Sequence, residues 1–145
     1  MRRGCIITIM VISAIVLVTS ILMFTLFWPK FKQTGTSTFA YVLEDGLEQY
    51  LADEKAYPPA TDNAGIVKFL WGENPREKKY VQDLDSYIKD GQITDFWENP
   101  FEFQMPAAGT EEKPIVTSAG PNGIHGDEDD IGSHVIRSKF ESGKQ

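Results

Sequence analysis

The chain has 145 residues, which is enough for one apolar helix and one folded domain, and its formal net charge is −7. An apolar run occupies residues 6–27, and all 21 acidic side chains follow it. Only 12 basic side chains lie in that following segment, so its formal net charge is −9. This balance argues against a nucleic-acid ligand, whose phosphates bind basic faces, and it permits a cation. The single cysteine, Cys5, excludes an intrachain disulfide.

Residues 6–27 form the first predicted element, an uncharged run of 22 residues. As a helix rising about 1.5 Å per residue it spans roughly 33 Å, the thickness of a bilayer's hydrocarbon core. A secretory signal has a shorter apolar region of about 7–15 residues and a small-residue cleavage site, and no such site follows here. A buried core helix would have a polar face. The run therefore predicts a retained transmembrane helix at residues 6–28.

The flanks of the predicted span indicate its orientation only weakly, because Arg2 and Arg3 precede it and Lys30 and Lys32 follow it. A short N-terminus normally stays in the cytoplasm, so we expect a cytoplasmic leader at residues 1–5. Pro29 lacks an amide hydrogen and is expected to kink or stop the helix, so a linker is predicted at residues 29–36. The domain at residues 37–145 is then expected on the other side of the membrane.

A second helix is predicted at residues 37–55, where apolar side chains recur at helical spacing on one face. We interpret this stripe as a core face, with a surface for a partner helix as the alternative. Tyr57-Pro58-Pro59 ends the helix. The stripe consists of Phe39, Leu43, Leu47, Tyr50 and Leu51.

A short helix is predicted at residues 63–71, capped by Thr61 or Asp62 and stopped by Gly72. The charged segment 73–79 reads as a solvated loop. Residues 80–89 fit either a short helix or an irregular packed segment, and Asp90-Gly91 is a turn signal.

The remainder of the chain predicts β structure. Apolar and polar residues alternate at 101–105, which is typical of a half-buried strand. Further strands are expected at 114–118 and 133–138, with a hairpin-like loop at 107–113 and a frayed tail at 140–145. The predicted fold class is α+β, with helices packed on a small antiparallel sheet.

The acidic loop at residues 118–132 carries the clearest chemical signal. Calcium takes roughly six to eight oxygen ligands from carboxylates, amides and carbonyls on a flexible loop. Adjacent acids repel one another, and a divalent cation removes that cost. A solvated acidic turn remains the alternative. Zinc is a poor candidate, because His125 and His134 have no cysteine pair to complete a tetrahedral site. The loop's candidate donors are Asn122, Asp127, Glu128, Asp129 and Asp130.

The sequence carries no recognisable catalytic motif. The sequence contains no G-x-S-x-G elbow, P-loop or H-E-x-x-H. We therefore predict that the protein is not an enzyme and has no small-molecule substrate.

Several motifs together resemble a known family. The basic leader precedes an apolar helix, and the amphipathic helix ends in Tyr57-Pro58. DFWENPF at residues 95–101 is similar to D-P-W-G-N-P-Y, with Glu98 in the place of glycine. SAGPNG at 118–123, followed by DEDDI at 127–131, is similar to S-x-G-x-D-G…D-D-I. In this order the motifs resemble the G-type major pseudopilin of type II secretion systems and its type IV pilin-like relatives, over nearly the whole chain.

The resemblance implies a pilin-like fold and a calcium ion in the loop after the second strand. By motif, the expected ligands are Asn122, Asp127, Asp129 and Asp130, with carbonyls of Val116 and Ser118 as further candidates. The expected partners are the lipid bilayer and other pilin-like subunits. The expected location is the bacterial inner membrane, crossed once, with the C-terminal domain in the periplasm. Calcium is expected to stiffen the loop, and through it the sheet, without doing chemistry.

The N-terminus departs from the family pattern. The family's processing site reads G-F-T-L-I-E or similar, and its peptidase cuts after the glycine. Here Gly4 is retained, but Cys5 replaces the phenylalanine and Ile9 replaces the glutamate that helps subunits register in the filament. Two hypotheses follow: a structural subunit of a secretion or pilus-like apparatus, and a permanently anchored calcium-binding adaptor that does not polymerise.

Overall fold

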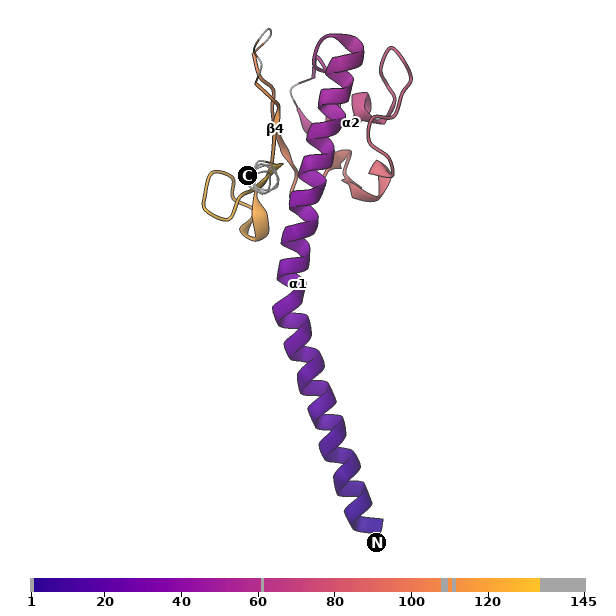
Figure 1. Ribbon diagram of the computed structural model, residues 1–145, viewed down its shortest axis with the longest axis vertical. Helices are drawn as coiled ribbons and strands as arrows, with labels where there is room; N and C mark the ends of the chain where they lie inside the picture. Colours follow the sequence, from indigo (N-terminus) through magenta and orange to yellow (C-terminus); the bar gives the residue numbers. More distant parts are fainter. Residues whose placement is uncertain (1, 61, 108–109, 111, 134–145) are drawn as a thin grey trace, which may run out of the picture. The chain divides into compact units, whose positions relative to one another are not determined.

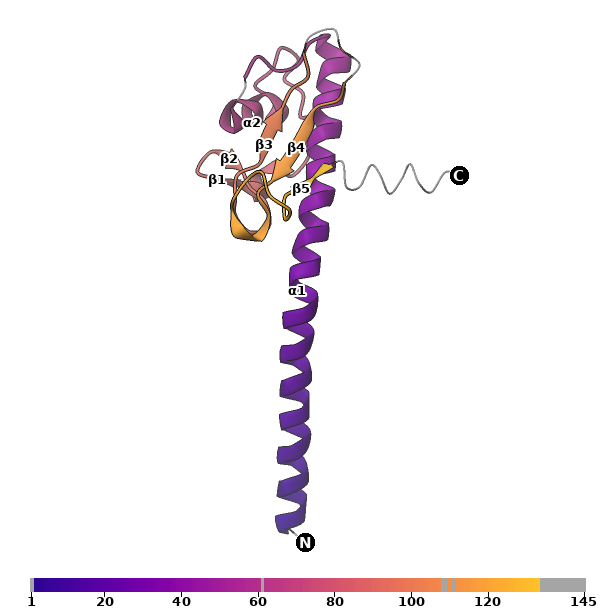
Figure 2. The same cartoon turned by 90° about the vertical axis from the view of Figure 1, so that its left-hand side faces the viewer.

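A computed structural model describes residues 2–60, 62–107, 110 and 112–133. It divides into two compact units, Met1–Lys32 and Gln33–Gln145, each of which is described by itself. The elements, shown in Figures 1 and 2, are helices α1 (Arg2–Glu54) and α2 (Asn63–Trp71), 3-10 helices η1 (Leu84–Tyr87) and η2 (Gly120–Asn122), and strands β1 (Ile88–Lys89), β2 (Gln92–Ile93), β3 (Glu102–Gln104), β4 (Ile115–Ser118) and β5 (Ile131–Gly132).

The first unit consists of the apolar part of α1. Within the described residues, one helical stretch, Met10–Glu54, is long and apolar enough to cross a membrane by length and composition, with a mean hydropathy of 2.5 in its most apolar window. Large apolar side chains from Met10 to Phe31 are exposed. Thr19, Ser20 and Thr25 donate hydrogen bonds to carbonyls one turn earlier, which satisfies their hydroxyls without water.

Pro29 does not stop the helix and residues 29–36 are not a linker between two helices, because α1 continues through Pro29 to Glu54. Proline removes one backbone donor, but the turns on either side keep their own bonds. The Phe96 ring packs closely against Gly35, where a Cβ would lie 2.9 Å from Cζ of Phe96. The neighbouring Thr36 is buried, and its Oγ1 accepts a hydrogen bond from the Phe96 amide at 3.3 Å. Tertiary contacts thus hold this stretch of helix.

The apolar stripe of α1 is a core face, as predicted. Phe39, Leu43, Leu47 and Tyr50 are buried in one cluster, whereas Leu51 is half-buried. The predicted end of the helix at residue 55 differs from Glu54 by one residue. α2 and the three-stranded sheet supply the opposing side chains. Those partners include Ile66, Val67, Leu70, Phe103 and Val116.

The short helix α2 has the predicted bounds, and Gly72 at φ 118° ends it as expected. Asp62 stands at the N-cap, but its side chain makes no capping hydrogen bond. The next residue, Asn63, is buried: its Nδ2 donates to the carbonyls of Ile93 (2.9 Å) and Phe101 (2.8 Å), and its Oδ1 accepts from the Ile93 amide (2.7 Å). This one side chain joins α2 to β2 and to the residue before β3.

The predicted solvated loop at residues 73–79 is tied to the end of α1. Arg76 pairs with Glu54 at 2.7 Å, and Lys78 pairs with Asp53 at 2.7 Å. The hydrogen bond from Lys78 lowers the pKa of the Asp53 carboxyl. Asn74 is buried and organises the loop from inside, because its Nδ2 donates to the carbonyls of two residues that flank it.

Two antiparallel sheets complete the domain. β1 and β2 form a hairpin around the predicted turn, so residues 80–89 contain both a 3-10 helix and a strand. The second sheet has the order β3-β4-β5, with Phe103 opposite Val116 and Ser118 opposite Ile131. The strands predicted at 101–105 and 114–118 are confirmed as β3 and β4. The third strand is β5, and most of the predicted strand at 133–138 lies outside the described residues.

Glu98, which stands in the place of the family's glycine, adopts φ 70°. A left-handed backbone costs a side-chain-bearing residue about 1–2 kcal/mol, while glycine's extra freedom in the unfolded chain costs about 0.4–1 kcal/mol. We expect Glu98→Gly to raise the free energy of unfolding by up to about 1 kcal/mol in urea titrations. Glu98→Gln, which removes the exposed ion pair with Lys89 but keeps the backbone penalty, should change it by less than about 0.5 kcal/mol. A glycine variant less stable than the glutamine variant would contradict this explanation.

Candidate metal centre

The acidic loop leaves the sheet at the end of β4 and returns to it at β5. η2 follows β4, and Gly123 at φ 74° turns the chain outward. The loop closes where its returning arm packs on Gly120, at φ 63°: a Cβ there would lie 2.3 Å from the carbonyl oxygen of Asp129. Glycine at 120 therefore permits the contact that brings the acidic run back beside η2.

Asn122 lies at the centre of the acidic side chains. Its Nδ2 donates to Oδ2 of Asp127 and to Oδ1 of Asp129, both at 2.7 Å. Its Oδ1 accepts from the Ile124 amide at 2.7 Å. The amide group thus bridges two carboxylates, which is the position that a cation takes between oxygen ligands.

The two bridged carboxyls have pKa values that move in opposite directions. Hydrogen bonds from Asp129 and Asn122 lower the pKa of Asp127. The hydrogen bond with Asp127, together with desolvation, raises the pKa of Asp129. Two carboxylates that lie beside the same amide repel each other, and a metal ion bound between them would relieve that repulsion.

Asp130 turns its carboxylate into the loop. Its Oδ2 accepts from the Gly126 amide at 2.8 Å, whereas its Oδ1 is buried and has no hydrogen-bond partner among the described residues. A buried carboxylate oxygen without a partner costs free energy, and coordination of a cation would recover it. The donors present, carboxylate and amide oxygens, are the hard ligands that calcium takes.

The structure brings Asn122, Asp127 and Asp129 together, with Asp130 in the same loop. Asn122, Asp127 and Glu128 are exposed, and Asp129 and Asp130 are half-buried. Within the described ranges, no group of three His, Cys, Asp or Glu side chains stands ready to hold a metal ion. The Asn122 amide group occupies the position between the carboxylates. Calcium binding at these residues therefore requires the amide to turn, so that its oxygen faces the ion.

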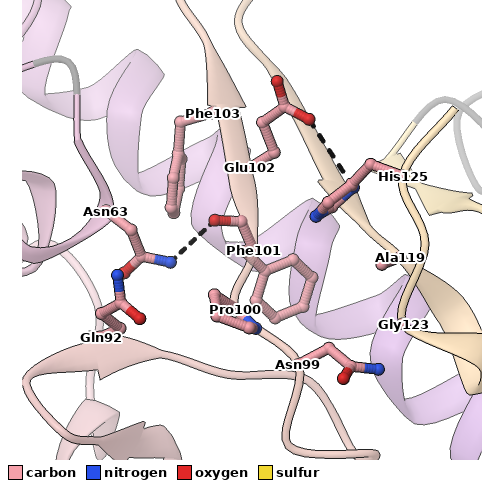
Figure 3. A pocket seen from close by; sticks show the side chains of 10 residues that line it. All are labelled: Asn63, Gln92, Asn99, Pro100, Phe101, Glu102, Phe103, Ala119, Gly123 and His125. Atoms are coloured by element: carbon pink, nitrogen blue, oxygen red, sulfur yellow. Dashed lines mark hydrogen bonds and ion pairs between the residues drawn. The ribbon is translucent and has the colours of Figure 1, made fainter.

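The histidines do not form a zinc pair in the described structure. His125 Nδ1 lies 3.6 Å from Oε2 of Glu102 on β3, and His134 lies outside the described residues. Beneath this pair is a pocket of about 420 Å³, with Asn63 and Gln92 on one side and Gly123 and His125 on the other (Figure 3).

The turn at residues 95–99 holds the start of the loop, and the sequence analysis missed this role. Asp95 is buried and its Oδ2 accepts from the Ser118 hydroxyl at 2.5 Å. Asn99 donates from Nδ2 to the Gly120 carbonyl at 2.7 Å. Both residues belong to the DFWENPF motif, in which Phe101 is buried and Trp97 is half-buried. The signal was a polar residue at each end of the turn.

A long apolar N-terminal helix and a domain of small antiparallel sheets packed on its amphipathic continuation define a protein of the pseudopilin fold. The crystal structure of the major pseudopilin from the type 2 secretion system of enterohaemorrhagic Escherichia coli is similar, with a TM-score of 0.50 and 25% identity, over 79% of this chain and 91% of that one. This confirms the expected α+β, pilin-like architecture of helix and sheet.

The family model for type II secretion system protein G matches residues 30–134, so the chain belongs to this family. The type II secretion system core protein G of Klebsiella michiganensis is 28% identical over 100 residues, which cover 67% of this chain and 65% of that protein. The match thus spans slightly less than two thirds of the relative's length. The family is one of structural pseudopilins and not a family of enzymes.

Proposed function

We propose that this protein is a structural pseudopilin-like subunit of a type II secretion or type IV pilus-like apparatus. The observation that carries the proposal is the family match over residues 30–134, which includes both sheets and the acidic loop. On this proposal the chain assembles with other pilin-like subunits, performs no catalysis and binds neither nucleic acid nor a small-molecule substrate.

The apolar part of α1 is the proposed membrane anchor. Exposed apolar side chains without charge suit a lipid environment. Phe24, Trp28 and Phe31 stack successively at 5.2 and 5.9 Å between ring centroids, where an interfacial aromatic belt would lie. We place the protein in the bacterial inner membrane, crossed once, with the N-terminus in the cytoplasm and residues 37–145 in the periplasm.

Calcium is the proposed stabilising ion of the acidic loop. Its proposed ligands are Asn122, Asp127, Asp129 and Asp130. Support comes from the convergence of the first three and from the buried Asp130 Oδ1 that has no hydrogen-bond partner in the described structure. The ion would replace the amide bridge, and it would fix the loop against the sheet without taking part in chemistry.

Asn122→Asp should have opposite effects with and without calcium. In chelator the variant loses both hydrogen bonds to the carboxylates and gains a like charge, so its thermal midpoint should fall by a few degrees. In calcium the added ligand charge should lower Kd, about tenfold for a gain of about 1.4 kcal/mol. Calorimetric titration and thermal melts of the full chain in detergent measure both effects. A midpoint that falls as far in calcium as it does in chelator would contradict the bridging role of the amide.

A permanently anchored calcium-binding adaptor is the second candidate, and Ile9 favours it. A glutamate inside a membrane helix is costly without a partner, so isoleucine in its place gives a more stable anchor and removes the group that seeks a neighbouring subunit.

Purification from membranes that contain the secretion apparatus separates the two candidates. The subunit hypothesis predicts an N-terminus beginning at Cys5 and crosslinks to other pilin-like subunits along α1. An unprocessed N-terminus and a chain without such crosslinks would support the adaptor. As a positive control, replacing Ile9 with glutamate restores the family residue and should increase crosslinking only if the chain assembles.

A further inference from the structure

The turn at residues 95–99 holds both polar groups of Gly120, the first residue of η2. The Gly120 amide donates to Oγ of Ser118 at 3.0 Å, and that hydroxyl donates to Asp95 at 2.5 Å. The Gly120 carbonyl accepts from Asn99 at 2.7 Å. The amide and the carbonyl of one residue are therefore fixed from two positions of the same turn.

Asp95 is itself held rigidly. Its Oδ1 accepts from the amides of Trp97 at 2.7 Å and Asn99 at 2.9 Å, and its exposed fraction is 5%. One oxygen of Asp95 therefore organises the turn, and the other binds Ser118. Through these bonds the turn fixes where the loop begins. The 95–99 turn is also bonded to α1, because the Phe96 amide donates a hydrogen bond to Oγ1 of Thr36.

Gly120 is also where the two arms of the acidic loop meet, since the Asp129 carbonyl packs against it. At the other end of η2, a Cβ on Gly123 would lie 3.2 Å from Oδ1 of Asn99, and Figure 3 shows the Asn99 side chain extending toward that segment. The 95–99 turn thus contacts η2 before and after Asn122, although in the described structure neither Asp95 nor Asn99 bonds to an acidic side chain of the loop.

We propose that Asp95 and Asn99 are positioning residues that set the calcium affinity of the loop. They fix η2, and with it Asn122, at the place to which Asp127 and Asp129 return. This inference rests on the proposed calcium function. Groups that orient metal ligands without touching the ion typically change metal affinity about 10- to 100-fold when removed.

The test is calcium titration of the full chain in detergent, with Asn99→Ala as the main variant. Ser118→Ala, which keeps the backbone carbonyl but breaks the connection from Asp95 to Gly120, is the second. Asn74→Ala is the matched control: it is the same substitution at an asparagine that organises residues 69–78 and has no partner in the acidic loop. Thermal midpoints in chelator are measured for all three variants.

Asn99→Ala and Ser118→Ala should each weaken calcium binding at least tenfold. Asn74→Ala should leave Kd within about twofold of wild type while lowering the midpoint in chelator. If wild type binds calcium and the first two variants bind it equally well, or if Asn74→Ala weakens binding as much, the positioning role is wrong and the calcium function stands. If wild type binds no calcium, the proposed function fails, and the inference fails with it.

Discussion

Replacing Asn63 with alanine should lower the free energy of unfolding by about 3 kcal/mol, the largest effect we expect from a single polar side chain in this domain. The change leaves the buried Ile93 amide and the Phe101 carbonyl without the partner that they have in the described structure. Each buried polar group left without a hydrogen bond costs about 1–3 kcal/mol. The Ile93 carbonyl keeps its bond from the Phe101 amide, so it adds little. Urea titration of the full chain in detergent measures the loss.

Asp62→Ala is the matched control, because Asp62 is the adjacent residue and stands at the N-cap of the same helix. Cap residues commonly contribute about 1 kcal/mol through a side-chain hydrogen bond, but Asp62 makes none. We expect its replacement to cost less than about 0.5 kcal/mol. A loss at Asp62 that equals the loss at Asn63 would show that helix capping, and not the connection to the sheets, explains the stability of this region.

Gly120→Ala should prevent the acidic loop from closing. The left-handed backbone costs alanine about 1–2 kcal/mol. The new methyl group would lie 2.3 Å from the Asp129 carbonyl oxygen, and backbone cannot move aside as a side-chain end can. Overpacking of this kind costs about 1–3 kcal/mol, so we expect a total loss of about 3 kcal/mol and the loss of measurable calcium binding.

Gly126→Ala separates the two causes. Gly126 lies in the same loop at φ 95°, but a Cβ there has nothing within 4 Å. This variant incurs only the backbone cost of about 1–2 kcal/mol, and it should still bind calcium. Equal losses in the two variants, measured by urea titration and calorimetry, would mean that the contact between Gly120 and Asp129 is unimportant.

The sequence predicted the elements that depend on local patterns. The spacing of Phe39, Leu43 and Leu47 placed a core face on α1, and Gly72 marked the end of α2 at the correct residue. Alternation at 101–105 predicted β3. Periodicity and termination signals act within a few residues, so they can be read along the chain.

Contacts between residues far apart in the sequence explain what was predicted wrongly or not predicted. Pro29 indicated a break, but the helix that follows it is held by buried residues such as Thr36 and Leu43, and α1 is continuous. The charged loop at 73–79 is solvated as predicted, since residues 73 and 75–79 are exposed, but its ion pairs with Asp53 and Glu54 were not predicted, because those partners are more than 20 residues away. No local pattern indicates such pairs.

The candidate site was predicted in part. Clustered acids and glycines pointed to the loop, and the family motif to Asn122 and the acidic run. The sequence did not indicate that the Asn122 amide bridges Asp127 and Asp129, or that Asp95 and Asn99 hold Gly120. Those contacts depend on how the 95–99 turn folds against the end of β4, which is a tertiary property.

The most direct test of the account is the thermal midpoint of the full chain in detergent with calcium, with magnesium and with chelator. A ligand that binds only the folded state at a hundredfold excess over Kd contributes about 2.7 kcal/mol, which is several degrees for a domain of this size. We predict such a rise with calcium alone, and none in the variant that combines Asp127→Ala with Asp130→Ala. Equal midpoints of the wild type in calcium and chelator would contradict the account and leave the acidic loop a solvated turn.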